Sequence, residues 1–320
     1  MDKKEKDRKQ IDEMNYMRKE DHIYTDSDGY KIRMVALVPE KPERVLLIPP
    51  LVGATGAWAI STFRYFSRKS SILMSFDYCG HYQGVDNKFT IKGTFKDTEA
   101  AISYATEYTR KKGLPLHAIG TCYGLIPLIY ILDALGWPEI IRSMFSVNGL
   151  FSMNELINFD NYKDYLKKRG LFFKNKADFI EFMSRNKDKI IRDRKIYVKA
   201  LTEYLAEIFP ELIDIISDES FGTLDYSRVE FYQSFYEFIA SDLPEIKITK
   251  NLPCLFFFGE NDKTLNLKEK ENKNRYVSQI KKMASHAQLC DIRIDHFGRG
   301  EDHYVIGEKG MSFLKENESI

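Results

Sequence analysis

The chain contains 320 residues, of which 43% are hydrophobic, and this is enough to bury a full core. Lys and Arg number 48 and Asp and Glu number 47, so the formal net charge is only +1. This balance excludes a domain-wide basic field that would attract nucleic acid or an anionic membrane. The expected partner is therefore a small molecule or another protein.

Residues 1–22 form a densely charged amino-terminal segment that lacks the apolar core of a secretory signal. We expect a solvated, helical extension here. Apolar runs elsewhere are too short or too interrupted to span a bilayer, so the sequence predicts a cytoplasmic protein without a membrane span.

Four cysteines are scattered along the chain without Cys-x-x-Cys spacing: Cys79, Cys122, Cys254 and Cys290. This spacing argues against a disulfide framework and against a zinc site, and we expect no metal and no cofactor. Cys254 and Cys290 lie in apolar segments, which is typical of small buried hydrophobic residues.

The segment IYTDSDGYKIRMVALVPE contains two β-like runs, and Asp28-Gly29 between them is a strong hairpin signal. Three short, continuous apolar runs then follow in chain order: RVLLIPPLVG, SSILMSFDYCG and HAIGTCYG. Such runs are typical of strands buried on both faces of a parallel sheet. Among them lies KGTFKDTEAAISYATEYTRKKG, which has helical apolar spacing, basic residues in its last turn and a closing Gly113. The alternation predicts an α/β fold with a mostly parallel sheet flanked by helices.

This strand and helix alternation stops after about residue 150. Residues 151–250 are rich in Phe, Tyr, Lys and Glu at helical spacing, whereas PCLFFFGEND and QLCDIRID resume the buried strand pattern. We therefore expect the first part of the core at residues 23–150, a helical cap insertion at 151–250 and the second part of the core at 251–320.

One cysteine lies between two glycines, Gly120 and Gly124, where an apolar strand run meets an apolar helical run. This Gly-x-Cys-x-Gly pattern resembles the nucleophile elbow of the α/β-hydrolase superfamily, with Cys122 where serine is usual. Small flanking residues let the strand and the helix pass closely around a strained turn. The alternative interpretation is a buried structural cysteine between incidental glycines.

Four other segments resemble the same superfamily in its usual order. RVLLIPPLVG resembles the third strand and the oxyanion loop, although Pro49-Pro50-Leu51 replaces the commoner His-Gly pair. SFDYCGHYQG resembles the loop after the fourth strand. PCLFFFGENDKTLN resembles the strand before the catalytic acid, and GEDHYVIGEKGMSFL resembles the histidine loop and the final helix.

The resemblance implies a catalytic triad. Cys122 would be the nucleophile, His303 the general base and Asp262 the acid that orients the imidazole. The backbone N–H groups of Tyr123 and Leu51 would bind the oxyanion.

His296 is the alternative base, because it also follows the last strand. His303 is preferred, since Gly300-Glu301-Asp302-His303 resembles the Gly-x-x-His ending of the superfamily.

Other polar residues near the motifs receive structural interpretations. His117 lies inside the strand before the elbow and is expected to be a core histidine with its hydrogen bonds satisfied. His81 and Cys79 belong to the loop after the fourth strand, where ordinary loop packing is favoured over a substrate contact. Asp97 is expected to be a surface or capping residue.

A thiol nucleophile favours a particular chemistry. Exchange between an acyl thioester and an enzyme thiol is close to isoenergetic, and the new thioester reacts readily with amines. The resemblance therefore points toward acyltransferase or thioesterase activity, with coenzyme A or an acyl carrier protein carrying the acyl thioester. Hydrolysis of an ester or lactone by the same triad is the alternative, and a non-catalytic binding module on the same fold is the third possibility.

Overall fold

The structure of the chain is a computed structural model. It describes residues 17–52, 54–81, 90–136, 141–151, 159–186, 189, 192, 194–208 and 252–318. The expected extension at residues 1–22 therefore lies largely outside the described residues.

An eight-stranded sheet forms the centre of the molecule, in the order β1-β2-β4-β3-β5-β6-β7-β8. Five neighbouring pairs are parallel, namely β3–β4, β3–β5, β5–β6, β6–β7 and β7–β8. The other two, β1–β2 and β2–β4, are antiparallel. The predicted mostly parallel α/β sheet is confirmed. The strands are β1 (Met17–Thr25), β2 (Lys31–Pro39), β3 (Arg44–Leu47), β4 (Ser71–Asp77), β5 (Leu116–Cys122), β6 (Met144–Gly149), β7 (Cys254–Gly259) and β8 (Gln288–Ile292).

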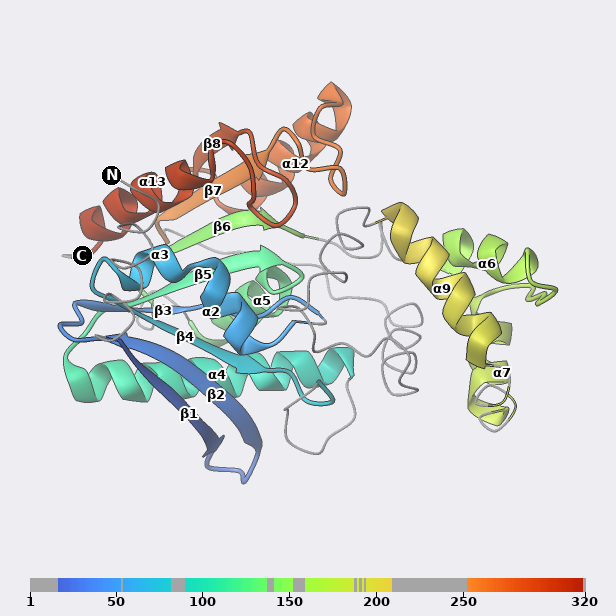
Figure 1. Cartoon of the computed structure of the whole chain (residues 1–320), viewed down its shortest axis with the longest axis horizontal. Helices are drawn as coiled ribbons and strands as arrows, with labels where there is room; N and C mark the ends of the chain where they lie inside the picture. Colours follow the sequence, from blue (N-terminus) through green and yellow to red (C-terminus); the bar gives the residue numbers. More distant parts are fainter. Residues whose placement is uncertain are drawn as a thin grey trace, which may run out of the picture.

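Helices cover both faces of this sheet (Figure 1). Side chains alternate between the faces along each strand, so Phe256 joins one buried cluster and Phe257 the other. The first cluster also contains side chains of α4, α5 and α12, and the second contains those of α2, α3 and α13. Burial on both faces explains why the parallel strands are continuous apolar runs in the sequence. These helices are α2 (Gly56–Thr62), α3 (Arg64–Ser67), α4 (Ile91–Lys112), α5 (Leu125–Leu135), α12 (Lys270–Met283) and α13 (His303–Glu316).

The predicted hairpin is present between β1 and β2. Gly29 has φ +80°, and the Asp26 carboxylate accepts hydrogen bonds from the N–H groups of Asp28 and Tyr30. β1 begins at Met17, so the last residues of the expected extension belong to a strand instead. The start of this strand, before Ile23, was not visible in the sequence because β1 is a largely exposed edge strand without the apolar alternation that marks a half-buried one.

The predicted helix before the elbow is also present as α4. Its first turn is capped by the Thr90 side chain, which accepts a hydrogen bond from the Gly93 N–H, and it ends at Gly113 with φ +65°. This helix packs against the sheet through the buried side chains of Ala101 and Ile102.

The described part of the expected insertion contains three helices: α6 (Phe159–Lys167), α7 (Lys176–Arg185) and α9 (Arg194–Ile208). They pack together through aromatic rings, with Tyr162 5.4 Å from Tyr204 and 6.0 Å from Phe179 between ring centroids. Figure 1 shows the three helices beyond the carboxyl ends of β5 and β6. Residues 152–158 and 209–250 of the expected cap lie outside the described residues, so the cap as a whole stays a prediction.

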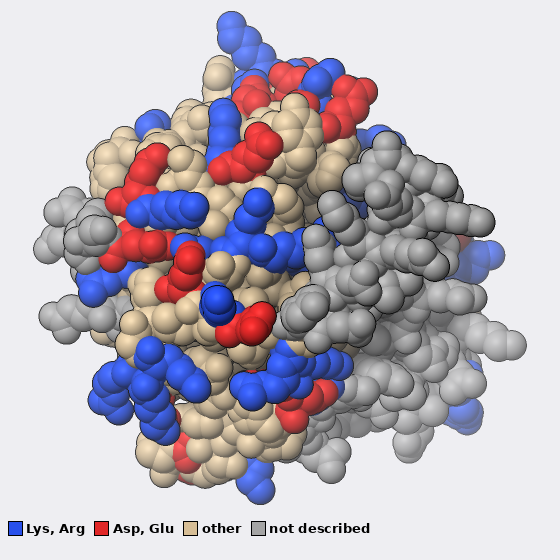
Figure 2. All heavy atoms as spheres, turned by 60° about the vertical axis from the view of Figure 1, so that its left-hand side comes forward, with Lys and Arg blue, Asp and Glu red and all other residues tan. Residues whose placement is uncertain are grey.

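The described surface carries both charge signs. Lys and Arg side chains are interspersed with Asp and Glu on the face shown in Figure 2, in keeping with the balanced composition. Within the described ranges, no helix has the length and apolar character needed to cross a membrane.

Candidate active site

Cys122 ends β5 at a tight turn into α5. Its φ is +44°, a left-handed conformation that costs free energy for a residue with a side chain. The pairing of β5 with β6 is irregular between Thr121 and Cys122, and α5 begins at Leu125. The sulfur therefore projects from a strained strand-to-helix turn, and only 7% of the residue is exposed.

The two flanking glycines are required by close approaches. A Cβ atom at Gly120 would lie 2.3 Å from Cδ1 of Leu125, and one at Gly124 would lie 2.6 Å from the carbonyl oxygen of Pro49. Any larger residue would push the turn away from its neighbours. The sequence pattern thus has the physical cause that was expected for it.

The carboxylate of Asp262 is fixed in the loop after β7. Its Oδ1 accepts a hydrogen bond from the Leu265 N–H at 2.8 Å, and its own N–H donates to the Gly259 carbonyl at 3.1 Å. Oδ2 accepts a hydrogen bond of 2.8 Å from Nδ1 of His296, and both side chains are fully buried. Asp262 therefore contacts an imidazole, and this imidazole is that of His296.

The other neighbour of this imidazole is Cys122. Burial alone would lower the pKa of His296, but the charges of Asp262 and Cys122, and hydrogen bonds with both, raise this pKa well above its usual value. A protonated imidazole at this position places a positive charge next to the sulfur. The three side chains thus form a continuous chain from carboxylate to imidazole to sulfur.

His303 does not take this place, so the preference for it over His296 is corrected. It is exposed, it begins α13, and its Nδ1 lies 3.2 Å from the Gly300 carbonyl oxygen. The preceding Asp302 instead accepts hydrogen bonds from the backbone and the guanidinium of Arg293.

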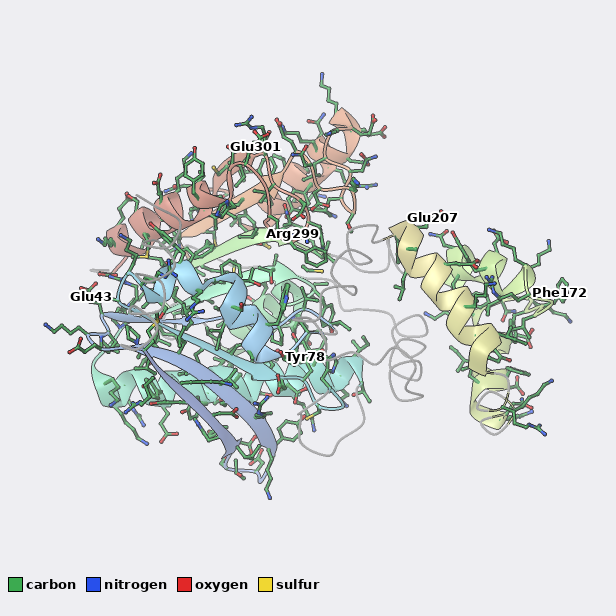
Figure 3. The ribbon with its side chains drawn as sticks, viewed as in Figure 1. Glu43, Tyr78, Phe172, Glu207, Arg299 and Glu301 are labelled. Carbon is green, nitrogen blue, oxygen red and sulfur yellow. The ribbon has the colours of Figure 1, made fainter. Side chains whose placement is uncertain are left out.

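His296 is placed by a short loop directly after β8. The Asp295 carboxylate accepts hydrogen bonds from the N–H groups of Phe297 and Arg299, which closes a tight turn around the histidine. Arg299, labelled in Figure 3, lies in this loop and also pairs with Asp295. An Asp followed by His just after a buried strand is the sequence signal that could have favoured His296.

The two backbone groups expected to bind an oxyanion belong to adjacent segments. Besides Pro49, the carbonyl oxygen of Pro50 would lie 2.9 Å from a Cβ at Gly124, so the loop carrying Leu51 touches the elbow. Leu51 is buried, and the Tyr123 hydroxyl is 2.7 Å from the Thr94 hydroxyl. Binding of an oxyanion by the N–H groups of Leu51 and Tyr123 stays a prediction.

Comparison with solved structures identifies the architecture. An α/β hydrolase of a Penicillium species, GrgF, aligns at TM-score 0.64 and 12% identity over 95% of this chain and 100% of that one. An esterase of Pyrococcus furiosus aligns at 0.55 and 13% over 94% and 92%, and a bromoperoxidase of Bacillus anthracis at 0.55 and 14% over 92% and 100%. The chain has the α/β-hydrolase fold. No protein-family model and no curated protein matches the sequence.

Within this α/β-hydrolase fold, His117 is a core histidine, as expected, but its hydrogen bonds are not all satisfied, since its buried Nε2 has no hydrogen-bond partner among the described residues. It is fully buried in β5, and its Nδ1 shares a hydrogen bond of 2.8 Å with the Ser143 hydroxyl. Burial, with the nearby charges of Arg44 and Arg142, lowers the pKa of His117 to about 3, so the ring is neutral at physiological pH.

Asp97 is buried, not at the surface, so the expectation for it is corrected. Its carboxylate accepts hydrogen bonds from the N–H and Sγ of Cys79, each at 3.0 Å, and from the Tyr30 hydroxyl at 2.8 Å. Burial raises the pKa of Asp97 in spite of these bonds. Asp97 and Thr94 share the buried face of α4, and a carboxylate on that face was the overlooked sequence signal.

A small cavity of about 130 Å³ adjoins the loop after β7 that carries Asp262 in this α/β-hydrolase fold. Leu150, Leu265 and Tyr276 are among the residues that line it. The Tyr276 hydroxyl donates a hydrogen bond of 2.8 Å to the Gly149 carbonyl, beneath the elbow. Among the described residues, no group of three His, Cys, Asp or Glu side chains could hold a metal ion.

Proposed function

We propose that the chain is an acyltransferase or thioesterase that works through a thioester acyl-enzyme on Cys122. The observation that carries this proposal is the buried contact series from Asp262 to His296 to Cys122 at a strained elbow. His296 replaces His303 as the proposed base. The substrate class is an acyl thioester, carried by coenzyme A or by an acyl carrier protein.

The proposed first half-reaction forms the acyl-enzyme. The Cys122 thiolate attacks the substrate carbonyl carbon, and the N–H groups of Tyr123 and Leu51 stabilise the negative oxygen. The intermediate then collapses, the carbon–sulfur bond to the carrier breaks, and the leaving thiolate takes a proton from His296. The products are the acyl-enzyme and the free carrier thiol.

The second half-reaction regenerates the enzyme. Neutral His296 removes a proton from an amine, alcohol or water as this acceptor attacks the Cys122 thioester. Asp262 stabilises the imidazolium that forms, and the Cys122 thiolate leaves. Transfer and hydrolysis differ only in the identity of the acceptor.

Hydrolysis of an ester or lactone is the second candidate. It is favoured by the structural similarity to an esterase, and the same three side chains would support it with an oxyester substrate. A binding module without catalysis is the third candidate, and the buried pair of His296 and Asp262 beside Cys122 argues against it.

The choice between these candidates can be measured directly. Purified protein is mixed with acyl-coenzyme A and acyl-carrier donors of several chain lengths, with and without amine or alcohol acceptors, and release of carrier thiol is followed. We expect thiol release that Cys122→Ala abolishes and that an acceptor accelerates. If acceptors do not change the rate of thiol release, the activity is thioester hydrolysis. Activity confined to oxyesters and lactones would favour the second candidate.

A further inference from the structure

Asn148 occupies a central position between the segments that carry the three proposed catalytic residues. It is fully buried near the end of β6 and has φ +46°. The next residue, Gly149, pairs with Cys122 in the sheet, and the N–H of Leu150 donates a hydrogen bond of 2.9 Å to the Cys122 carbonyl. The two residues that follow Asn148 thus attach its strand to the elbow.

The side chain of Asn148 joins two other segments. Its Oδ1 accepts a hydrogen bond of 2.8 Å from the Gly259 N–H, and its Nδ2 donates one of 2.6 Å to the Asp295 carbonyl. The Gly259 carbonyl in turn accepts the N–H of Asp262, and Asp295 directly precedes His296. A single side-chain amide therefore connects the loop of Asp262 and the loop of His296 to β6, the strand beside Cys122.

Asparagine suits this position for two reasons. It tolerates a left-handed backbone better than most residues with a side chain. Its amide offers one donor and one acceptor, which match a backbone carbonyl on one side and an N–H on the other. An aspartate of the same shape offers only acceptors when ionised and would repel the Asp295 carbonyl.

We propose that Asn148 is a positioning residue that holds the imidazole of His296 between Asp262 and Cys122. The inference rests on the triad of the proposed function. Catalytic groups lose much of their effect when they are displaced by about 1 Å, so a buried link between both loops matters for the reactivity of the sulfur.

The test compares two Asn→Gly variants at left-handed positions. Asn148→Gly keeps the backbone conformation and removes both side-chain hydrogen bonds. The matched control, Asn266→Gly, changes an exposed residue with φ +48° in the loop of Asp262. The readout is the rate at which iodoacetamide alkylates Cys122, located by peptide mass. We expect Asn148→Gly to slow alkylation near neutral pH by about 10- to 100-fold and the control to keep the wild-type rate.

Combination with His296→Ala separates positioning from a merely structural role. If Asn148 acts through His296, then Asn148→Gly should slow alkylation no further once the imidazole is gone. Slowing by the same factor in both backgrounds would overturn the proposal. A wild-type rate in Asn148→Gly, with His296→Ala slow, would also overturn it and leave the proposed function standing. An unchanged rate in His296→Ala alone would overturn both.

Asn148→Asp supplies a second test. Unlike Asn148→Gly, it keeps the size of the buried side chain and leaves no cavity in the fold. A protonated carboxyl both donates and accepts, as the amide does, whereas a carboxylate only accepts. The ratio of the variant's alkylation rate to that of the wild type should therefore fall as pH rises. A ratio that is independent of pH would contradict the need for a donor toward Asp295.

Discussion

At the scale of single residues, the environment of His296 decides how Cys122 can react. The imidazole is enclosed, with the Asp262 carboxylate bonded to Nδ1 at 2.8 Å and the Cys122 sulfur as its other partner. Both neighbours favour the protonated ring, so His296 holds a positive charge beside the sulfur. The proposed reactivity of Cys122 therefore depends on its contact with His296.

The two histidines after β8 make a matched pair for mutation. His296→Ala should slow acylation of Cys122 by about 10²- to 10⁴-fold through loss of the general base. His303→Ala should leave the rate unchanged, because its exposed ring is bonded only to the Gly300 carbonyl among the contacts described. Single-turnover kinetics with one acyl thioester measures both variants. The reverse order of effects would restore His303 as the base.

The raised pKa of His296 also predicts how stability depends on pH. The folded state holds the proton more tightly than the unfolded state, whose histidine has a pKa of about 6.5. The resulting stabilisation is complete below that pH and is lost as pH rises through the higher folded pKa. The free energy of unfolding in urea, compared between wild type and His296→Gln, should show a gap that narrows with rising pH. A gap that is constant or widens would contradict the raised pKa.

At the scale of elements, the turn from β5 to α5 depends on contacts with the loop after β3. Gly124 is the contact point, since the carbonyl oxygens of Pro49 and Pro50 leave no room for a side chain there. The proline pair gives this loop a restricted backbone, so it cannot easily move away. The position of Leu51 relative to Cys122 follows from this contact.

A matched pair of glycine substitutions tests that contact. Gly124→Ala should destabilise the fold by about 1–3 kcal/mol through overpacking and should slow alkylation of Cys122. Gly136→Ala, in open space with φ +73° at the end of α5, should cost about 1–2 kcal/mol through backbone strain without changing alkylation. Urea unfolding and alkylation rates measure both effects. Equal alkylation in the two variants would show that the contact does not position the elbow.

At the scale of the whole molecule, the sheet could be predicted from the sequence because its parallel strands are buried on both faces. That burial leaves continuous apolar runs such as those of β4 and β7, with turn residues at their ends. The elbow was also predictable, since its glycines answer to close packing with Leu125 and Pro49. β1 was missed at its start because an exposed edge strand carries no such pattern.

The parts that could not be predicted depend on where side chains point in three dimensions. The sequence spacing allowed either His296 or His303 to contact Asp262. The tight turn closed by Asp295 places His296 in that position. The burial of Asp97 and the two hydrogen bonds of the Asn148 side chain likewise involve segments far apart in the chain. A single sequence contains no direct record of such contacts.

The most direct measurement is the mass of the protein after mixing with an acyl-coenzyme A donor, followed by mapping of the modified peptide. The wild type should gain one acyl group on Cys122, and Cys122→Ala should gain none. Cys254→Ala is the matched control, because burial in β7 raises the pKa of that thiol to about 12 and its loss should not change the labelling. An adduct that forms equally in Cys122→Ala would contradict Cys122 as the nucleophile.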